Sequence, residues 1–203
     1  MNVLVIDTET TGLPPRNADP SDYHKYDGCR VIQIAWGVYT EVGKLLYEEE
    51  YIIKPDTFTI PEDSVRIHGI TNEHAQSVGK SEEFVFGKLY DALQNVSVAV
   101  AHNMAFDNGA ILAELFRLRS DTVDLDIDID VPEVLNKWLI IPKECTMLMA
   151  LQPGERWPKL IDLYTKLFKV APSDILHRAD ADVRVCARVY FELTKDRPIH
   201  YNI

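Results

Sequence analysis

Residues 3–13, with the sequence VLVIDTETTGL, form the stretch that decides the fold. The first four are apolar and mostly β-branched, which is typical of a strand buried on both faces, and Gly12 ends the regular segment. If the strand continues to residue 9, Asp7 and Glu9 project from the same face, because side chains alternate along a strand. Neighbouring carboxylates repel each other, so the pattern predicts a divalent cation between them, and Mg²⁺ prefers such oxygen ligands.

The rest of the chain alternates between strand and helix patterns. Turn-forming residues predict loops at residues 14–30 and 55–61. Strands are predicted at residues 31–39, 44–53, 97–101 and 138–141, the first two joined by a turn near Gly43. Helices are predicted at residues 72–78, 81–95, 105–118, 143–151, 158–168 and 179–194. This order predicts a single α/β domain over residues 1–203, with a mixed sheet flanked by helices, a core to about residue 194 and a short tail at 195–203.

Composition places the chain among ordinary globular proteins. It has 203 residues, 46% of them hydrophobic and 26% charged, which suits one domain and excludes a disordered or fibrous chain. No apolar run approaches the roughly 18 residues of a membrane-spanning helix, and the N-terminus lacks the basic region of a signal peptide. Three cysteines without a CxxC spacing argue against disulfides and zinc. We therefore expect no membrane partner and a reducing, intracellular location in the cytoplasm.

The excess of acidic residues limits how the protein can bind nucleic acid. The 21 Lys and Arg residues are outnumbered by 32 Asp and Glu residues, which gives a formal net charge of −11. Proteins that bind nucleic acid over a wide surface neutralise its phosphates with a basic face. Any such activity must therefore use a small site where cations replace the missing basic side chains, or depend on delivery by a partner protein.

Two later segments add further carboxylates and a histidine, side chains that can bind a metal or accept a proton. HNMAFD at residues 102–107 follows a predicted strand, which delivers Asp107 to the same end of the sheet as the first two acids. HRADAD at residues 177–182 overlaps the start of the last predicted helix, so that His177 and Asp182 can converge on one site. Imidazole has a pKa near ~6.5 and can accept a proton at neutral pH. Taken alone, an aspartate at position 107 is more often a helix-terminus feature than a ligand. Asp182 can equally be a first-turn helix acid, and His177 an ordinary surface residue.

Together these segments resemble the DEDDh 3′→5′ exonuclease family, the DnaQ-like group of the RNase H-like superfamily, across nearly the whole chain. The matching residues are Asp7 and Glu9 in its first motif, Asp107 in its second, and His177 with Asp182 in its third. The segment VRIHGIT at residues 65–71 resembles a further family element. A histidine at position 177, where sister groups carry a tyrosine one residue nearer the last Asp, indicates the DEDDh branch.

The resemblance implies a two-metal mechanism. It assigns Asp7 to both Mg²⁺ ions, Glu9 and Asp182 to the ion on the nucleophile side, and Asp107 to the second ion. Mn²⁺ is expected to substitute for Mg²⁺. His177 is the implied general base, which takes a proton from the attacking water. The implied product is a nucleoside 5′-monophosphate released from a nucleic-acid 3′ end.

The resemblance also implies contacts with the terminal nucleotide. The residues concerned are Thr10, Thr11, Gly12, Leu13, His68, Asn103 and Phe106. Leu13 is expected to pack against the base and His68 to approach the sugar and phosphate, while Gly12 allows close backbone approach without a Cβ. Core packing is an equal interpretation of Phe106, and a capping or core role is an equal interpretation of His68.

An acidic run at residues 121–133 invites comparison with a calcium loop. It has aspartates at alternate positions, namely Asp124, Asp126, Asp128 and Asp130. An EF-hand loop would need Gly at its sixth position and Glu at its twelfth, where the chain has Ile129 and Leu135. A solvated acidic edge or loop is the better interpretation.

The leading prediction is a metal-dependent 3′→5′ exonuclease acting on single-stranded or frayed DNA ends in proofreading or repair. The first motif and HGIT most resemble polymerase-associated proofreaders, so a polymerase or other carrier is an expected partner. The alternative with the same chemistry is an exoribonuclease, which a contact to the 2′-OH would distinguish. The alternatives of another class are a non-catalytic interaction module on the same fold and an acidic metal-binding protein without hydrolase activity.

Overall fold

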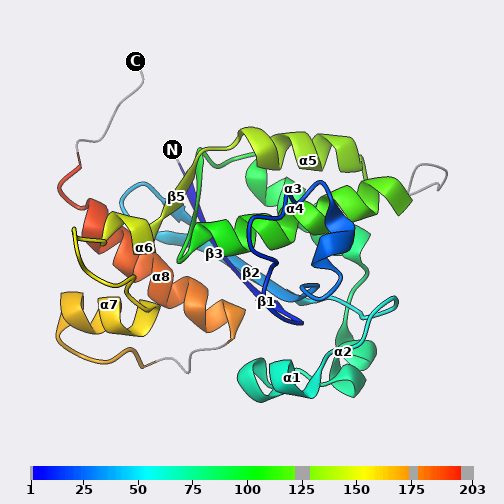
Figure 1. The fold of residues 1–203 in the computed structure, drawn as a ribbon. Helices are drawn as coiled ribbons and strands as arrows, with labels where there is room; N and C mark the ends of the chain where they lie inside the picture. Colours follow the sequence, from blue (N-terminus) through cyan, green and yellow to red (C-terminus); the bar gives the residue numbers. More distant parts are fainter. Residues whose placement is uncertain (1, 122–128, 174–177, 198–203) are drawn as a thin grey trace.

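The computed structural model describes residues 2–121, 129–173 and 178–197, and a five-stranded sheet forms its centre (Figure 1). The strands are β1 Asn2–Thr10, β2 Val31–Thr40, β3 Leu45–Ile52, β4 Val98–Ala101 and β5 Lys143–Cys145. They follow in the order β3-β2-β1-β4-β5. β1 pairs antiparallel with β2 and parallel with β4, so the predicted mixed sheet is confirmed. The carboxyl ends of β1 and β4 therefore face the same way.

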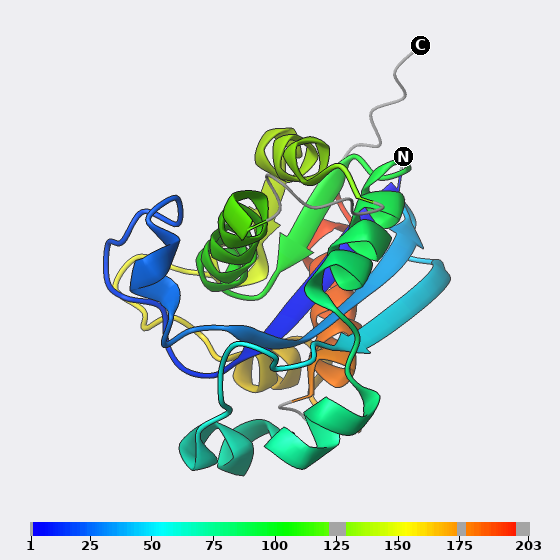
Figure 2. The ribbon, with the colours of Figure 1, turned by 90° about the vertical axis from the view of Figure 1, so that its right-hand side faces the viewer.

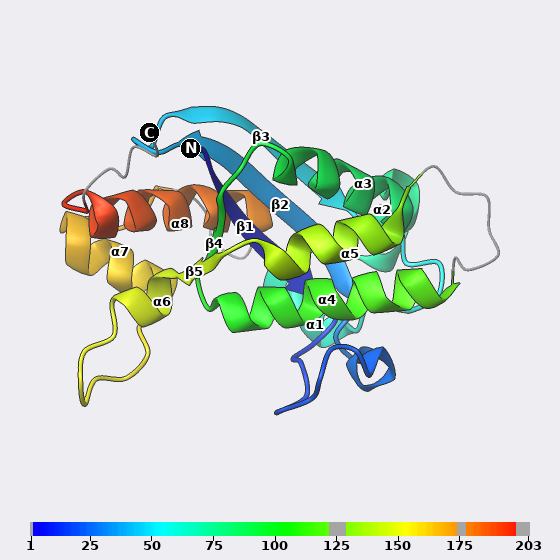
Figure 3. The same cartoon turned by 90° about the horizontal axis from the view of Figure 1, so that it is seen from above.

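Helices cover both faces of this sheet (Figure 2). One face carries α3 Glu82–Leu93, α4 Met104–Asp121 and α5 Val131–Ile140, and the other carries α7 Leu160–Phe168 and α8 Ala179–Thr194. α4 lies beside α5, and α7 lies beside α8 with α6 Thr146–Met149 next to it (Figure 3). The short helices α1 Glu62–His68 and α2 Asn72–Val78 lie together below the sheet in Figure 1, and the 3₁₀ helix η1 Tyr23–Tyr26 interrupts the loop between β1 and β2.

The side chains of β1 divide between the two helical layers. Leu4 packs with residues of α3, α4 and α5, whereas Val3 and Val5 pack with residues of α7 and α8. Because the alternation continues along the strand, Asp7 and Glu9 stand in the row of Val3 and Val5. Both acids therefore face the layer that contains α8.

Capping side chains explain where several helices begin and end. Thr71 accepts a hydrogen bond from the backbone N–H of His74 at the start of α2, and Ser81 does the same for Phe84 at the start of α3. The predicted helices at residues 72–78 and 179–194 are confirmed. α1 was not predicted, although Gly69 marks its end: the residue has a φ of 78°, the left-handed conformation in which glycine commonly ends a helix.

The strand predicted at residues 138–141 is wrong. Trp138 is fully buried in α5, where it continues a helical row with Val131, Val134 and Leu135. A short apolar run fits a strand or a buried helix equally well, and here the row extends backwards at helical spacing. The strand of this region is β5, and the helix predicted at residues 143–151 is only the four-residue α6.

Some predicted features lie outside the described residues, namely His177 and the aspartates at 124, 126 and 128. Asp130, the last of the alternating aspartates, accepts a hydrogen bond from the N–H of Glu133 and caps α5. None of the helices that the structure describes has the length and apolar character needed to cross a bilayer.

Candidate active site

Three carboxylates from β1 and α8 meet at one place. Asp7 and Glu9 project from β1 toward the α8 layer, and Asp182 lies in the first turn of α8. One ligand oxygen from each of the three side chains lies within 4.8 Å of the other two. The structure thus brings together acids of the first and third sequence motifs, which are separated by more than 170 positions in the chain.

A fourth acid, Asp107, is held beside them by Thr8. β4 pairs with β1 only at residues 3–5, so the backbone N–H of Thr8 lies beyond the paired segment and can bind a side chain. Asp107 Oδ1 accepts a hydrogen bond from this N–H (3.0 Å) and another from the Thr8 hydroxyl (2.8 Å). Asp107 is buried in the first turn of α4. Both bonds from Thr8 use the same oxygen, which leaves Oδ2 for other contacts.

Burial and mutual repulsion raise the pKa values of these carboxyl groups. Burial raises the pKa of Asp7 well above its ordinary value, and the charges of Asp107, Asp182 and Glu9 raise it further. The pKa of Glu9 rises to about 7, mainly through burial and then through Asp182 and Asp107. Burial also raises the pKa of Asp107 to about 7, although the hydrogen bonds from Thr8 act to lower it. The cluster therefore concentrates negative charge that folding alone does not favour.

This donor set fits the divalent metal that the sequence predicts. Carboxylate oxygens are the hard ligands that Mg²⁺ and Mn²⁺ prefer. The oxygens of Asp7, Glu9 and Asp182 are close enough for one cation to contact all three. A cation would also favour the ionised carboxylates and so lower their pKa values. The spacing of the oxygens and the concentration of negative charge both favour a divalent cation as the ligand.

The segment that follows β1 is fixed by bonds within the protein. The Thr10 hydroxyl donates to the carbonyl of Gly12 (2.7 Å). The Thr11 hydroxyl accepts a bond from the N–H of Arg30 (2.8 Å), while the Thr11 N–H donates to the Arg30 carbonyl (2.9 Å). Ser64 of α1 donates its hydroxyl to the Thr11 carbonyl. Both threonine side chains are buried and already hydrogen-bonded, so their main effect is to set the shape of this loop.

Gly12 is required by the protein's own loop. A Cβ at this position would lie 2.6 Å from the carbonyl oxygen of Gly28, a backbone atom that cannot turn aside. We expect Gly12→Ala to force residues 12 and 28 apart and to cost about 1–3 kcal/mol of stability, as overpacking does. The melting temperature should then fall by about 5 °C, and nuclease activity should fall with it.

Gly28→Ala provides the matched control for this prediction. A Cβ at Gly28 would meet no heavy atom within 4 Å. Thermal melting of the two variants side by side should show a loss only for Gly12→Ala. Equal melting temperatures and equal activities would contradict this account of Gly12.

The other predicted substrate residues differ in exposure. Leu13 is 84% exposed, and Phe106 is half-buried. His68 is buried at the end of α1, where its Nδ1 accepts a bond from the Ile70 N–H (3.0 Å) and its Nε2 has no partner among the described residues. Burial lowers the pKa of His68. Asn103 has a φ of 68°, a left-handed conformation that is uncommon outside glycine and concentrated at functional sites.

Two residues beside the acids were missed by the sequence interpretation. Thr8 orients Asp107, and Gln33 lies opposite Glu9 where β1 pairs with β2. Gln33 is a polar residue that interrupts the apolar run VIQIAWGVY at residues 31–39, and Thr8 lies between the two acids of the first motif. A buried polar side chain needs a hydrogen-bonding partner, which is the signal that could have identified both.

Known protein sequences are similar to this chain over most of its length. A family model described as "Exonuclease" (RNase_T) matches residues 4–190. The DNA polymerase III subunit epsilon of Rickettsia felis is 30% identical over 201 residues, which cover 96% of this chain and 74% of that protein. The 3′-5′ exonuclease DinG of Bacillus subtilis is 28% identical over 199 residues, which cover 98% of this chain and 18% of that protein.

Solved structures share the fold. Exonuclease I of E. coli in complex with a dT13 oligonucleotide has a TM-score of 0.67 and 22% identity, covering 97% of this chain and 41% of that one. An exonuclease I from Methylocaldum szegediense has a TM-score of 0.67 and 19% identity, covering 98% of this chain and 41% of that one. The present chain thus corresponds to about two fifths of these proteins, and the likeness concerns the mixed sheet with its flanking helices.

Proposed function

Because this chain belongs to the exonuclease family and is a 3′→5′ exonuclease, we propose that it releases nucleoside 5′-monophosphates from the 3′ ends of DNA in proofreading or repair. The observation that carries the proposal is the meeting of Asp7, Glu9 and Asp182, with Asp107 held beside them. Buried charges are normally paired or bound to metals. An acidic cluster of this kind is a means of placing cations against a phosphodiester.

Each acid has a proposed role in holding the metal. Asp7, Glu9 and Asp182 would hold one divalent ion, and Asp7 with Asp107 would hold a second, each Mg²⁺ or Mn²⁺. When bound, two such ions stabilise the entering and leaving oxygens of the displacement and lower the pKa of water. Thr8 keeps Asp107 oriented through two hydrogen bonds, independently of any ligand.

The remaining roles belong to a base and a nucleotide pocket. We assign His177 as the general base, since a neutral imidazole can accept the proton of the attacking water near pH 7. The exposed Leu13 would pack against the terminal base, while His68, Asn103 and Phe106 would line the pocket, supported by the loop of Thr10, Thr11 and Gly12. The Nε2 of buried His68 has no partner in the part of the chain that the structure describes, which supports a contact with a substrate oxygen, because a buried donor otherwise lacks its hydrogen bond.

The names of the relatives support DNA as the substrate. The proteins of Rickettsia felis and Rickettsia conorii are subunits of DNA polymerase III, and the solved E. coli exonuclease I holds a DNA oligonucleotide. A net charge of −11 gives this chain little general attraction for a polyanion. We therefore propose that it acts on a single-stranded or frayed 3′ end and is delivered by a polymerase or another carrier.

Product analysis tests the proposed function. The purified chain is incubated with 5′-labelled single-stranded DNA, 3′-mismatched duplex and RNA of the same sequence, with Mg²⁺, Mn²⁺ or a chelator. We expect a ladder that shortens from the 3′ end, nucleoside 5′-monophosphates as products, faster turnover of DNA and no reaction with chelator. Internal cleavage or full activity in chelator would contradict the mechanism, and faster turnover of RNA would overturn the choice of substrate.

The role of His177 is tested by substitution. We expect His177→Ala to lower turnover by about 10²–10⁴-fold, the usual contribution of a positioned general base. His24→Ala changes an exposed histidine of η1 and serves as the control, with turnover close to that of the wild type. Equal turnover in the two variants would remove His177 from the mechanism.

A further inference from the structure

Gln33 connects the strand pair of the active site to the start of α8. It lies on β2 directly opposite Glu9, and residues paired in this way point to the same face of the sheet. The side chain is only 3% exposed. Its Oε1 accepts a hydrogen bond of 3.1 Å from the backbone N–H of Ala179, which is 146 positions away in the sequence. Ala179 is the first residue of α8, and Asp182 follows it within the same turn.

This hydrogen bond replaces a local helix cap. The first N–H groups of a helix have no partner within the helix and are usually satisfied by a side chain just before it. At α8 the preceding residue is Arg178, whose side chain makes no capping bond. The N–H of Ala179 is satisfied from β2 instead. The first N–H of α8 is therefore bonded to the strand that pairs with β1.

The orientation of the Gln33 amide follows from its second contact. Its Nε2 donates to a carboxylate oxygen of Glu50 on β3. A carboxylate accepts and an amide nitrogen donates, so the amide oxygen must face Ala179. Glu50 also lies 3.7 Å from the guanidinium of Arg178. Gln33 is thus held on both sides, between β3 and the first residue of the helix.

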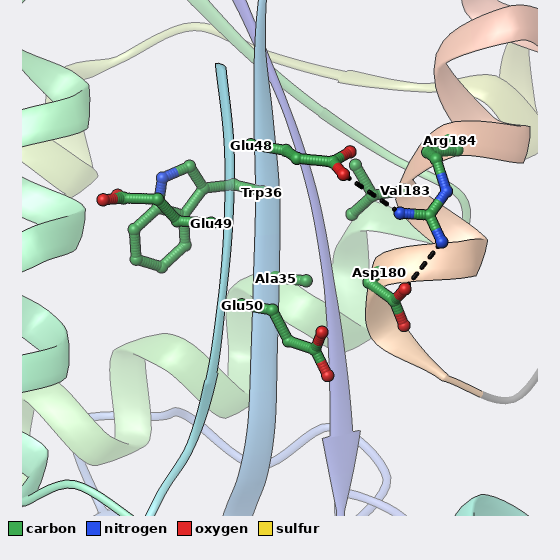
Figure 4. A pocket seen from close by; sticks show the side chains of 8 residues that line it. All are labelled: Ala35, Trp36, Glu48, Glu49, Glu50, Asp180, Val183 and Arg184. Atoms are coloured by element: carbon green, nitrogen blue, oxygen red, sulfur yellow. Dashed lines mark hydrogen bonds and ion pairs between the residues drawn. The ribbon is translucent and has the colours of Figure 1, made fainter.

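Other contacts between β3 and α8 are more exposed. Figure 4 shows Arg184 of α8 between Glu48 of β3 and Asp180, at 3.2 Å and 2.6 Å, beside a cavity of about 240 Å³. The side chains of Arg184 and Glu48 are 36% and 44% exposed. Exposed ion pairs of this kind contribute about 0–1 kcal/mol and tolerate movement. Among these contacts, the bond from Gln33 to Ala179 is the most buried.

We propose that Gln33 is a positioning residue for the catalytic metal site. By fixing Ala179, it sets the first turn of α8 so that Asp182 stands against Asp7 and Glu9. The inference rests on the proposed function and adds a residue to it. Displacements of about 1 Å in an active site can cost roughly 10²-fold in rate, so one hydrogen bond at this place has an effect much larger than its share of stability.

The test uses Gln33→Met, which keeps the length of the side chain and removes its hydrogen bonds. We expect kcat to fall about 10–100-fold and the Kd for Mn²⁺ to rise by about tenfold, as when the partner of a metal ligand is lost. KM for the oligonucleotide should change less than threefold. In the metal-free protein, amide exchange should accelerate in the first turn of α8 while the rest of the helix stays protected.

Glu48→Gln is the matched control. It weakens the exposed ion pair between β3 and α8 and leaves both contacts of Gln33 in place, so we expect kcat and Mn²⁺ affinity within about threefold of the wild type. If Gln33→Met does not fold, Gln33→Asn replaces it: this variant remains polar but withdraws the oxygen from Ala179, with the same expected pattern. A folded Gln33 variant with unchanged kcat, Mn²⁺ affinity and amide exchange would overturn the proposal, as would an equal loss of kcat in Glu48→Gln.

The outcomes separate this inference from the proposed function. If the wild type binds no Mn²⁺ and releases no nucleotides, the proposed function fails before Gln33 is examined. If the wild type binds Mn²⁺ and shortens DNA, but the Gln33 variants do so equally well, only the positioning role fails.

Discussion

Asp7→Asn should abolish nuclease turnover and, at pH 8, raise the melting temperature of the metal-free protein. Asparagine has almost the same shape as aspartate but lacks the charge that a cation requires. Burial and the charges of three other acids raise the pKa of Asp7, and in the proposed function it is the acid that would contact both ions. Metal ions contribute several kcal/mol of charge stabilisation, and each 1.36 kcal/mol is worth a factor of ten, so we expect a loss of about 10³-fold or more.

The gain in stability follows from the direction of the pKa shifts. The pKa values of Asp7 and Glu9 are raised in the folded protein, so the folded state holds their protons more tightly than the unfolded state does. As the pH rises above the ordinary carboxyl range of about 4, the unfolded chain ionises first and the metal-free folded state is progressively disfavoured. The penalty is complete above the folded pKa values, of which that of Glu9 is about 7.

Removing one of the crowded charges relieves this penalty. About 1 kcal/mol of relief corresponds to roughly 2–4 °C for a chain of this size, so we expect a rise of about 3 °C at pH 8 and a smaller one at pH 5. The measurement is thermal unfolding in chelator together with turnover in Mg²⁺. Asp162→Asn, an exposed acid in the first turn of α7, is the control and should change neither quantity. Retained turnover, or a loss of stability at pH 8, would contradict the account.

Of the substitutions proposed for this chain, Glu114→Gln should cause the largest fall in the free energy of unfolding. Glu114 lies on α4 and is 1% exposed. Its carboxylate accepts bonds from the Arg30 Nε (2.9 Å), from the backbone N–H of Val31 (2.9 Å) and from a guanidinium nitrogen of Arg117. Both arginines are buried. A neutral amide leaves the two guanidinium groups without their shared counter-charge and turns an N–H₂ group toward other donors.

Removing one partner of a buried ion pair typically costs about 3–5 kcal/mol. For this chain length that corresponds to a fall of about 10 °C in melting temperature. The effect should reach the active site, because the backbone of Arg30 makes two hydrogen bonds with Thr11 in the loop after β1. Thermal unfolding measures the first effect, and KM for the oligonucleotide measures the second.

Glu62→Gln is the corresponding change on the surface. Glu62 and Arg66 of α1 are 3.9 Å apart, and their side chains are 96% and 68% exposed. Pairs of this kind contribute about 0–1 kcal/mol, so the melting temperature should stay within about 2 °C of the wild type. If the two substitutions have similar effects, the buried cluster does not hold the loop as described.

The sequence predicted the positions of site residues correctly where they depend on the local spacing of side chains along one strand or one helix. Alternation along β1 places Asp7 and Glu9 on one face, and the helix pattern at residues 179–194 puts Asp182 in a first turn. It was less informative where contacts join distant segments. The bonds from Thr8 to Asp107 span 99 positions and the bond from Ala179 to Gln33 spans 146, and no local spacing encodes either.

The strand predicted at residues 138–141 was wrong because contacts with a distant segment, not the local sequence, distinguish a strand from a helix there. Four apolar or aromatic residues can form a buried strand or one face of a helix, and their identity alone does not separate the two. Trp138 is buried in α5, and its indole N–H donates to Asn108 of the neighbouring helix α4 (3.0 Å), a contact that supports the helix. The side chain of Asp130 caps the N-terminal end of α5, which also supports a helix in this region.

Manganese binding, counted by titration with electron paramagnetic resonance at pH 8, tests the central claim most directly. We predict that the wild-type chain binds two Mn²⁺ ions, and that Asp7→Asn weakens both while Asp162→Asn weakens neither. A wild-type chain that shortens DNA without binding Mn²⁺, or an Asp7→Asn variant with unchanged binding, would contradict the claim that these carboxylates assemble to hold the catalytic metal.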